Sequence, residues 1–296
     1  PGKEVNGAMV RAMPAASPEV GVELLRALAA RGAEEAGQAV AARLTDANEP
    51  VRMAALKSLA VLGGREQIAA VIASLKAATN ETHREAAQGT LAAIAERVGA
   101  ACVEDILKAF PGATTESRLV LLRTLGIAGG PAALEAVRAG LTQDDRRLKE
   151  AAFRVLTEWP SVDAAPELLR LARTSAETGW RVMAFRGFVR LGREADCPPD
   201  VRLRLLNDAM NAASGVEEKR LVIAAMAEQH EPAALQLLRP GFEDAALAQE
   251  ACLAAVRIAA AADPKHRNDL VPVLRQVLKI STRQDVREDA RNLLQS

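Results

Sequence analysis

Three arginines recur at nearly constant spacing and could do chemistry together: Arg123, Arg154 and Arg186. An arginine side chain is a planar fork that donates two parallel hydrogen bonds, which suits carboxylates and phosphates. If the fold stacks these residues on one face, they form an anion-binding ladder. Arg147 and Arg190 are close enough in sequence to extend its rim.

The alternative is ordinary surface salt bridging, with no partner involved. Glu150 lies four residues before Arg154 and Glu158 four residues after it, so either could pair with it on one helix. Both interpretations stay open at the level of sequence.

The sequence contains no motif for metal binding, nucleophilic catalysis or phosphate binding. The histidines and cysteines are widely spaced, with no HExxH or CxxC pair, and GxSxG and phosphate-binding glycine motifs are missing. We therefore predict no metal, no cofactor, no disulfide framework and no catalytic residue. The histidines are expected to face solvent or to lie at caps near helix ends, and the cysteines to be small apolar residues in helices or connectors: His83, His230, His266, Cys102, Cys197 and Cys252.

The elements that must position the arginines are helices. In the stretch 44–64, Asp46, Asn48 and Pro50 mark a turn and a helix start. The apolar residues that follow keep the spacing of one helical face. Gly63 and Gly64 then end the helix. The unit is a first helix, a polar turn and a second helix.

This unit recurs along the chain. In each copy, apolar residues lie three and seven positions after one register position, which is usually cationic: Arg52, Arg84, Arg118, Lys149, Arg181, Lys219, Gln249 and Arg287. A period of about 30–45 residues is typical of a solenoid. The three arginines of the ladder each lie five residues after a register position, so they fall on the same face of successive second helices.

The signature Asp46, Val51-Arg52, Ala55-Leu56 and Leu62-Gly63 resembles HEAT repeats, especially their short bacterial form, which also occurs in phycobilisome-lyase-type repeats. The resemblance implies an all-α fold, a right-handed α-α superhelix of about eight hairpins related to armadillo folds. It also implies a structural role, tying neighbouring repeats, for the turn aspartate and the register cations: Asp46, Arg52, Arg84, Arg118, Lys149, Arg181 and Arg287.

We expect residues 1–17 to be a partly ordered leader and 18–296 to be one repeat domain. Its hairpins are predicted at 34–62, 65–98, 101–128, 131–158, 163–191, 198–229, 231–262 and 265–295. Trp159 and Trp180 fall at register positions that predict burial in the core. The chain begins with Pro1, which indicates processing or excision from a longer polypeptide.

Composition narrows the function. Lys plus Arg and Asp plus Glu number 38 each, so the net charge is zero, which argues against a general nucleic-acid binder. No stretch is long and apolar enough to span a membrane. The sequence favours a non-catalytic, cytoplasmic scaffold whose concave face binds a protein or peptide, with an acidic segment opposite the arginines; an exported parent protein also fits. The alternatives are a phycobilin-lyase-like subunit and a nucleic-acid-binding repeat protein.

Overall fold

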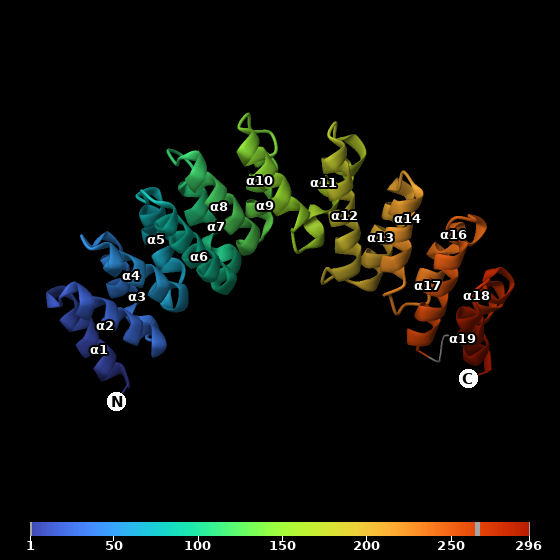
Figure 1. Ribbon diagram of the computed structural model, residues 1–296, viewed down its shortest axis with the longest axis horizontal. Coiled ribbons are helices and arrows are strands. Elements are labelled where there is room, and N and C mark those ends of the chain that lie inside the picture. The colour runs from blue at the N-terminus through green and yellow to red at the C-terminus, as the bar shows by residue number, and fades with distance from the viewer. Residues whose placement is uncertain (1, 264–266, 296) are drawn as a thin grey trace. The chain divides into compact units, whose positions relative to one another are not determined.

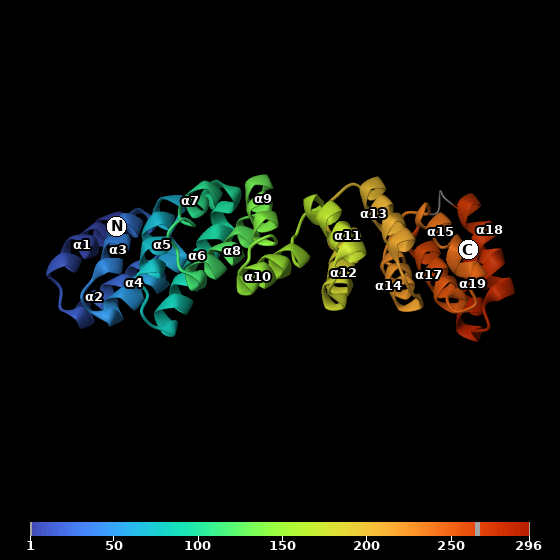
Figure 2. The same cartoon turned by 90° about the horizontal axis from the view of Figure 1, so that it is seen from above.

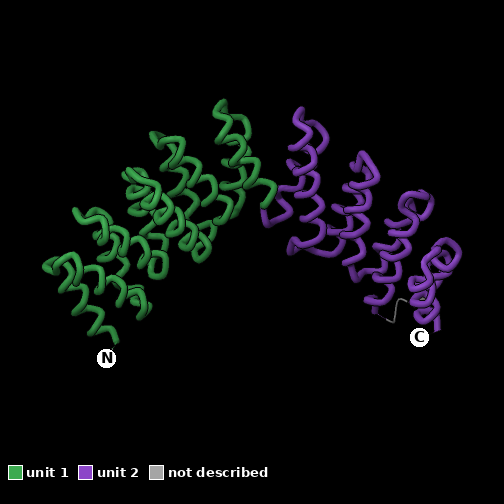
Figure 3. The backbone as a smooth tube through the Cα atoms, in the orientation of Figure 1, with its two compact units in different colours: residues 1–158 green, residues 159–296 purple. Residues whose placement is uncertain are grey.

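The structure, a computed structural model, describes residues 2–263 and 267–295, and these contain helices and turns but no strand. The backbone divides into two compact units, Pro1–Glu158 and Trp159–Ser296 (Figure 3). Each unit is a stack of helical hairpins. The all-α repeat fold predicted from the sequence is thereby confirmed for the described residues.

Unit 1 contains ten α-helices in its described part, joined by turns and short 3-10 segments. They are α1 (Gly2–Ala12), α2 (Pro18–Ala30), α3 (Gly37–Ala42), α4 (Glu49–Leu62), α5 (Ile68–Lys76), α6 (Glu81–Val98), α7 (Val103–Lys108), α8 (Thr115–Ala128), α9 (Pro131–Gly140) and α10 (Arg146–Thr157). The hairpins predicted from the sequence in this part of the chain are 34–62, 65–98, 101–128 and 131–158. Residues 2–12, which the sequence predicted as part of a partly ordered leader, form α1.

The hairpins of unit 1 stack in two layers, one of first helices and one of second helices (Figures 1 and 2). The second helices α4, α6, α8 and α10 each pack against the next. Buried hydroxyls tie some of these neighbours together: Ser58 donates to the Leu25 carbonyl at 3.0 Å and Thr90 to the Leu56 carbonyl at 2.9 Å. The stack therefore gains directional bonds inside an otherwise apolar core.

Side chains from the preceding turns cap the starts of α8 and α10. The Ser117 N–H donates to the Thr114 hydroxyl at 3.2 Å at the start of α8, and the Arg147 N–H donates to Asp145 at 2.9 Å at the start of α10. Helix α1 is fastened by Asn6, which donates to Glu35 at 2.8 Å and accepts from Arg31 at 2.6 Å. A buried asparagine with both ends bonded explains why this segment is ordered.

Unit 2 repeats the pattern with one irregular first helix. Its α-helices are α11 (Ala165–Thr174), α12 (Thr178–Glu194), α13 (Pro199–Ala212), α14 (Val216–Met226), α15 (Ala234–Leu237), α16 (Arg239–Glu243), α17 (Ala248–Ala261), α18 (Arg267–Ile280) and α19 (Gln284–Gln295). The first helix of the hairpin predicted at 231–262 is split into α15 and α16 beside Pro240, which has no N–H to donate to a continuous helix.

Two tryptophans and one histidine differ in how deeply the structure buries them. Trp159 is 2% exposed, so its place in the core is confirmed, whereas Trp180 is only half-buried at the start of α12, where its ring is not enclosed. The prediction of a solvent-facing histidine is wrong for His83, which is buried and lies 2.8 Å from the Ser74 hydroxyl through Nε2. His230 is exposed, and His266 lies outside the described residues.

Cys102 and Cys252 are buried, and Cys197 is half-buried. Burial raises the pKa of Cys102 and brings that of Cys252 to about 11, so these two thiols stay protonated at neutral pH. This agrees with the prediction of small apolar residues. Within the described residues, no group of three His, Cys, Asp or Glu side chains is placed to hold a metal ion.

Candidate functional site: an arginine groove in unit 1

A groove of about 350 Å³ lies between the second helices α8 and α10. Three of the five arginines proposed for the ladder line it, together with two glutamates and three apolar side chains: Arg123, Arg147, Arg154, Glu150, Glu158, Leu119, Ala151 and Val155. We call this the arginine groove. The repeat register brings these residues together because Arg123 and Arg154 occupy the same position on adjacent second helices.

The two helices are fixed to each other near their starts. The Thr115 hydroxyl donates to Asp145 at 3.0 Å, and Arg147 forms an ion pair with Glu116 at 3.0 Å. A backbone N–H at the helix start and the Arg147 guanidinium hold the pKa of Glu116 below its usual range. Arg147 is therefore already engaged by the protein and forms a wall of the groove.

Arg154 differs from Arg147. Its side chain is exposed and forms no ion pair or hydrogen bond with any residue in the described ranges 2–263 and 267–295. Glu150, one turn away, pairs with Arg146 at 2.7 Å instead. Arg154 therefore forms no salt bridge with Glu150 or Glu158, the two partners that the alternative interpretation offered.

Arg123 is also exposed and meets only a neutral partner. Its Nη1 donates to the Gln88 side-chain oxygen at 3.3 Å, on the neighbouring helix α6. An amide leaves the cation without a counter-charge, so Arg123 keeps its capacity for a carboxylate. The groove thus holds two cations, Arg123 and Arg154, that no acidic side chain of the described residues neutralises.

Arg186 and Arg190 lie in unit 2, on α12, so the structure does not place them beside Arg154. Arg186 is exposed and lines a separate hollow next to Gly215 and Val216. Arg190 donates through Nη2 to the Trp159 carbonyl at 2.6 Å, which fastens α12 to the start of the unit. The continuation of the ladder through these two residues stays a prediction.

Three of the register cations bond to the turn that precedes their helix. Arg52, Arg181 and Arg287 each donate from Nη1 to the backbone carbonyl six residues earlier, at 2.7, 3.0 and 3.2 Å. These bonds lie within one hairpin, whereas the resemblance to HEAT repeats placed Arg52 between hairpins. Asp46 likewise accepts from the Asn48 N–H at 2.9 Å, and it pairs with Arg43 at 2.5 Å.

The remaining register positions vary. Arg84 pairs with Glu81 on its own helix, while the side chains of Arg118 and Lys149 form no hydrogen bond or ion pair within the described part of the chain. Further bonds between hairpins come from residues that the sequence did not single out. In unit 1 these include Ser58 and Thr90, which lie one position after the ladder position. A hydroxyl residue that recurs one position after the ladder position is the sequence feature that could have predicted these bonds.

Comparison with known proteins agrees with this architecture. Residues 8–92 match the family described as HEAT repeats, and the resemblance predicted from the sequence is confirmed. A search of curated proteins finds no significant match. No helix among the described residues combines the length and apolar character that crossing a membrane requires.

Solved structures share the helical repeat fold. Kap121p is 12% identical with a TM-score of 0.51, covering 97% of this chain and 37% of that one. Kap121p bound to Pho4p is 12% identical with a TM-score of 0.50, covering 97% and 36%. An engineered protein is 19% identical with a TM-score of 0.41, covering 97% and 87%. This chain spans little more than a third of Kap121p, and at this identity the likeness shows the fold.

Proposed function

We propose that this protein is a non-catalytic binding module that holds an acidic protein segment in the arginine groove of unit 1. The observation that carries the proposal is Arg154, an exposed cation left without a counter-ion although two glutamates lie one helical turn away. Surface arginines with acidic neighbours at that spacing commonly pair with them. Here the groove keeps the guanidinium available.

A carboxylate that enters the groove could accept hydrogen bonds from two guanidinium groups. Arg123 and Arg154 lie on adjacent packed helices, and both line the same hollow. Leu119, Ala151 and Val155 supply an apolar floor on which the backbone or a methylene of a bound segment can lie. The fold supports this use, because solenoids present extended faces to partners, and Kap121p is one such fold described in complex with a protein, Pho4p.

The test uses a fluorescein-labelled ten-residue peptide of alternating glutamate and glycine, titrated by anisotropy into the full chain. We expect the double variant Arg123→Met with Arg154→Met to bind about ten-fold more weakly or worse, since each charge-assisted bond is worth roughly 1.5–3 kcal/mol. Glu158→Gln should bind more tightly, because it removes an acid from the groove.

The matched control removes two exposed cations that already have acidic partners. Lys108 pairs with Glu104 at 2.7 Å and Arg204 with Asp200 at 3.0 Å. The double variant Lys108→Met with Arg204→Met has the same net charge as the groove variant, and we expect it to bind like the wild type. Equal weakening in both double variants would show that only net charge matters and would contradict the proposal.

A further inference from the structure

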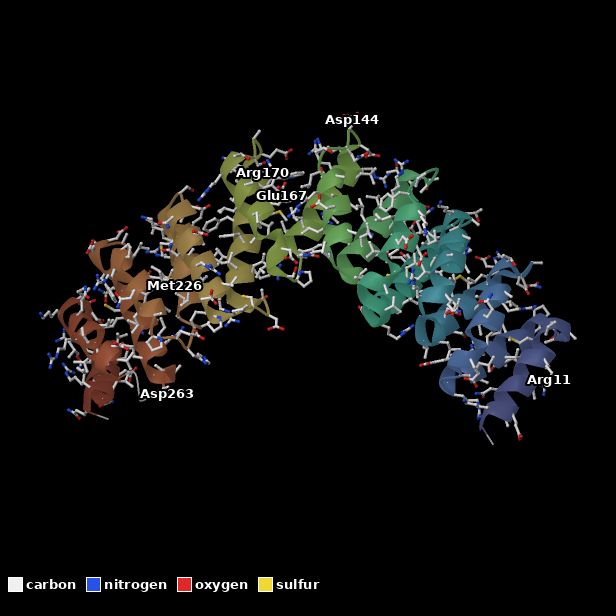
Figure 4. All side chains as sticks on the ribbon, turned by 180° about the vertical axis from the view of Figure 1, so that it is seen from behind. Arg11, Asp144, Glu167, Arg170, Met226 and Asp263 are labelled. Atoms are coloured by element: carbon white, nitrogen blue, oxygen red, sulfur yellow. The ribbon has the colours of Figure 1, made fainter. Side chains whose placement is uncertain are left out.

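A second hollow in unit 1 is apolar and lies where two neighbouring hairpins turn. It measures about 370 Å³ and is lined by α7, α8, α9, α10 and the turns between them. Its main side chains are Leu107, Phe110, Arg118, Leu122, Ala139 and Leu148. We call it the turn pocket. Figure 4 labels Asp144, which lies in the α9–α10 turn just beyond the Gln143 rim of this pocket.

Arg118 is the one cation among the side chains that line the turn pocket. It is half-buried, its Nε is buried without a hydrogen-bond partner, and its guanidinium forms no ion pair with any described residue. A buried N–H donor without an acceptor is unfavourable and is uncommon in folded proteins. An arginine in this state is suited to an acceptor that a ligand brings.

Other hairpins use an arginine at this register position differently. At the same register position, Arg52 and Arg181 donate to the carbonyl six residues earlier. The residue six before Arg118 is Gly112, whose φ of 71° is left-handed, whereas Asp46 in the first turn has a φ of −58°. The turn before α8 takes a different path, and its carbonyls are not bonded to the arginine.

We propose that the turn pocket binds a peptide segment in which one carboxylate lies beside one large apolar side chain. The apolar side chain would pack on Leu107, Phe110 and Leu122, and the carboxylate would accept from the Arg118 guanidinium. Charge complementarity selects this occupant, because the pocket offers carbon surface around a single unneutralised cation. Gln143 at the rim can bond to the peptide backbone.

This site is separate from the arginine groove, and the inference goes beyond the proposed function. Arg118 and Arg123 lie on the same helix, but five residues apart they point about 140° away from each other. Each lines its own hollow, and no residue lines both. Changes at Arg118 and at Arg123 therefore test the two sites independently.

The experiment titrates the full chain with a labelled six-residue peptide whose central residues are leucine and glutamate, flanked by glycine and serine. We expect Arg118→Met to weaken binding about ten-fold or more, the effect of one charge-assisted hydrogen bond. Ala139→Leu, which fills the pocket from an exposed position and keeps the charge, should weaken binding as well. Arg204→Met, which removes an exposed cation already paired with Asp200 at 3.0 Å, is the control and should change affinity less than about two-fold.

Two further peptides separate the parts of the ligand, one with glutamine for glutamate and one with alanine for leucine. We expect both to bind about ten-fold more weakly. The ¹⁵N resonance of the Arg118 Nε–H should shift on binding of the leucine-glutamate peptide. Unchanged affinity in Arg118→Met, equal binding of the glutamine peptide, or binding of anionic phospholipid vesicles but not of peptide would overturn the proposal.

Discussion

Two turns of unit 1 carry an arginine at the same register position and use it differently. In the turn before α4, Arg52 donates to the carbonyls of Asp46 and Ala47 at 2.7 and 3.0 Å. In the turn before α8, Arg118 makes no such bond and lines an apolar pocket. The same residue type at the same repeat position thus closes one hairpin and stays available in the other.

The repeat register therefore determines where an arginine lies in the hairpin, but not whether its side chain bonds to the turn. A turn that offers its carbonyls engages the arginine, and a turn built around a left-handed glycine does not. Arginines on the second helices differ in the same way. Arg147 pairs with Glu116, whereas Arg123 and Arg154 have no acidic partner among the described residues. Arginines that stabilise the fold and arginines left over for binding can therefore be told apart by their hydrogen bonds.

The largest expected effect is a difference in stability between variants of the two turn arginines. Arg52→Met should lower the free energy of unfolding by about 2 kcal/mol, because two charge-assisted hydrogen bonds to carbonyls are lost. Arg118→Met should change it by about 0.5 kcal/mol or less, since nothing is bonded to that side chain. Urea unfolding and amide exchange of α4 and α8 would measure both. If the two variants lose equal stability, the comparison fails.

The next effect concerns the turn itself. Gly112→Ala should cost about 1–2 kcal/mol, because an alanine Cβ crowds the backbone at a left-handed φ. A Cβ at Gly112 would meet no other side chain within 4 Å, so the backbone conformation is the only cost. Ala47→Gly, in the turn that needs no left-handed residue, is the control and should cost less. A neutral Gly112→Ala would mean that the turn before α8 does not depend on its glycine.

The smallest expected effect is a pH dependence of stability that arises from His83 on α6 and its neighbour Arg52 on α4. Burial, followed by the positive charge of Arg52, lowers the pKa of His83 from 6.5. Below pH 6.5 the unfolded chain takes up a proton that folded His83 resists, so stability should fall as the pH falls through and below that value; above it the contribution is constant. Thermal unfolding from pH 7.5 down to 5 should show this decline.

Variants sharpen the pH prediction. His83→Gln should flatten the decline, and Arg52→Met should move its lower end to higher pH by raising the pKa of His83. His230→Gln is the control, because His230 is exposed. A decline that persists unchanged in His83→Gln would assign it to other groups.

Helix starts can be predicted from the sequence because they depend on local signals. Ser17-Pro18 and Thr114-Thr115 mark helix starts that the structure reproduces. The sequence does not predict which polar groups meet. His83 was expected in solvent or at a cap, but α5, the first helix of the same hairpin, packs over it and places the Ser74 hydroxyl beside its ring, a contact that no local pattern encodes.

The site shows the same limit. Register arithmetic brought Arg123 and Arg154 to one groove, since equal positions on packed repeats are neighbours. The pairing of Glu150 with Arg146 instead of Arg154 depends on side-chain rotamers and could not be read from spacing, because both arginines lie four residues away. The turn pocket was likewise hidden, as it depends on the path of the turn around Gly112.

The most direct test of the division between engaged and available arginines is the ¹⁵N order parameter of each arginine Nε–H in solution. We predict a value for Arg52 near that of rigid backbone, about 0.85, and values for Arg154 and Arg118 that are lower, with Arg154 below about 0.6. An Arg52 side chain as mobile as Arg154, or an Arg118 side chain as rigid as Arg52 without ligand, would contradict the account.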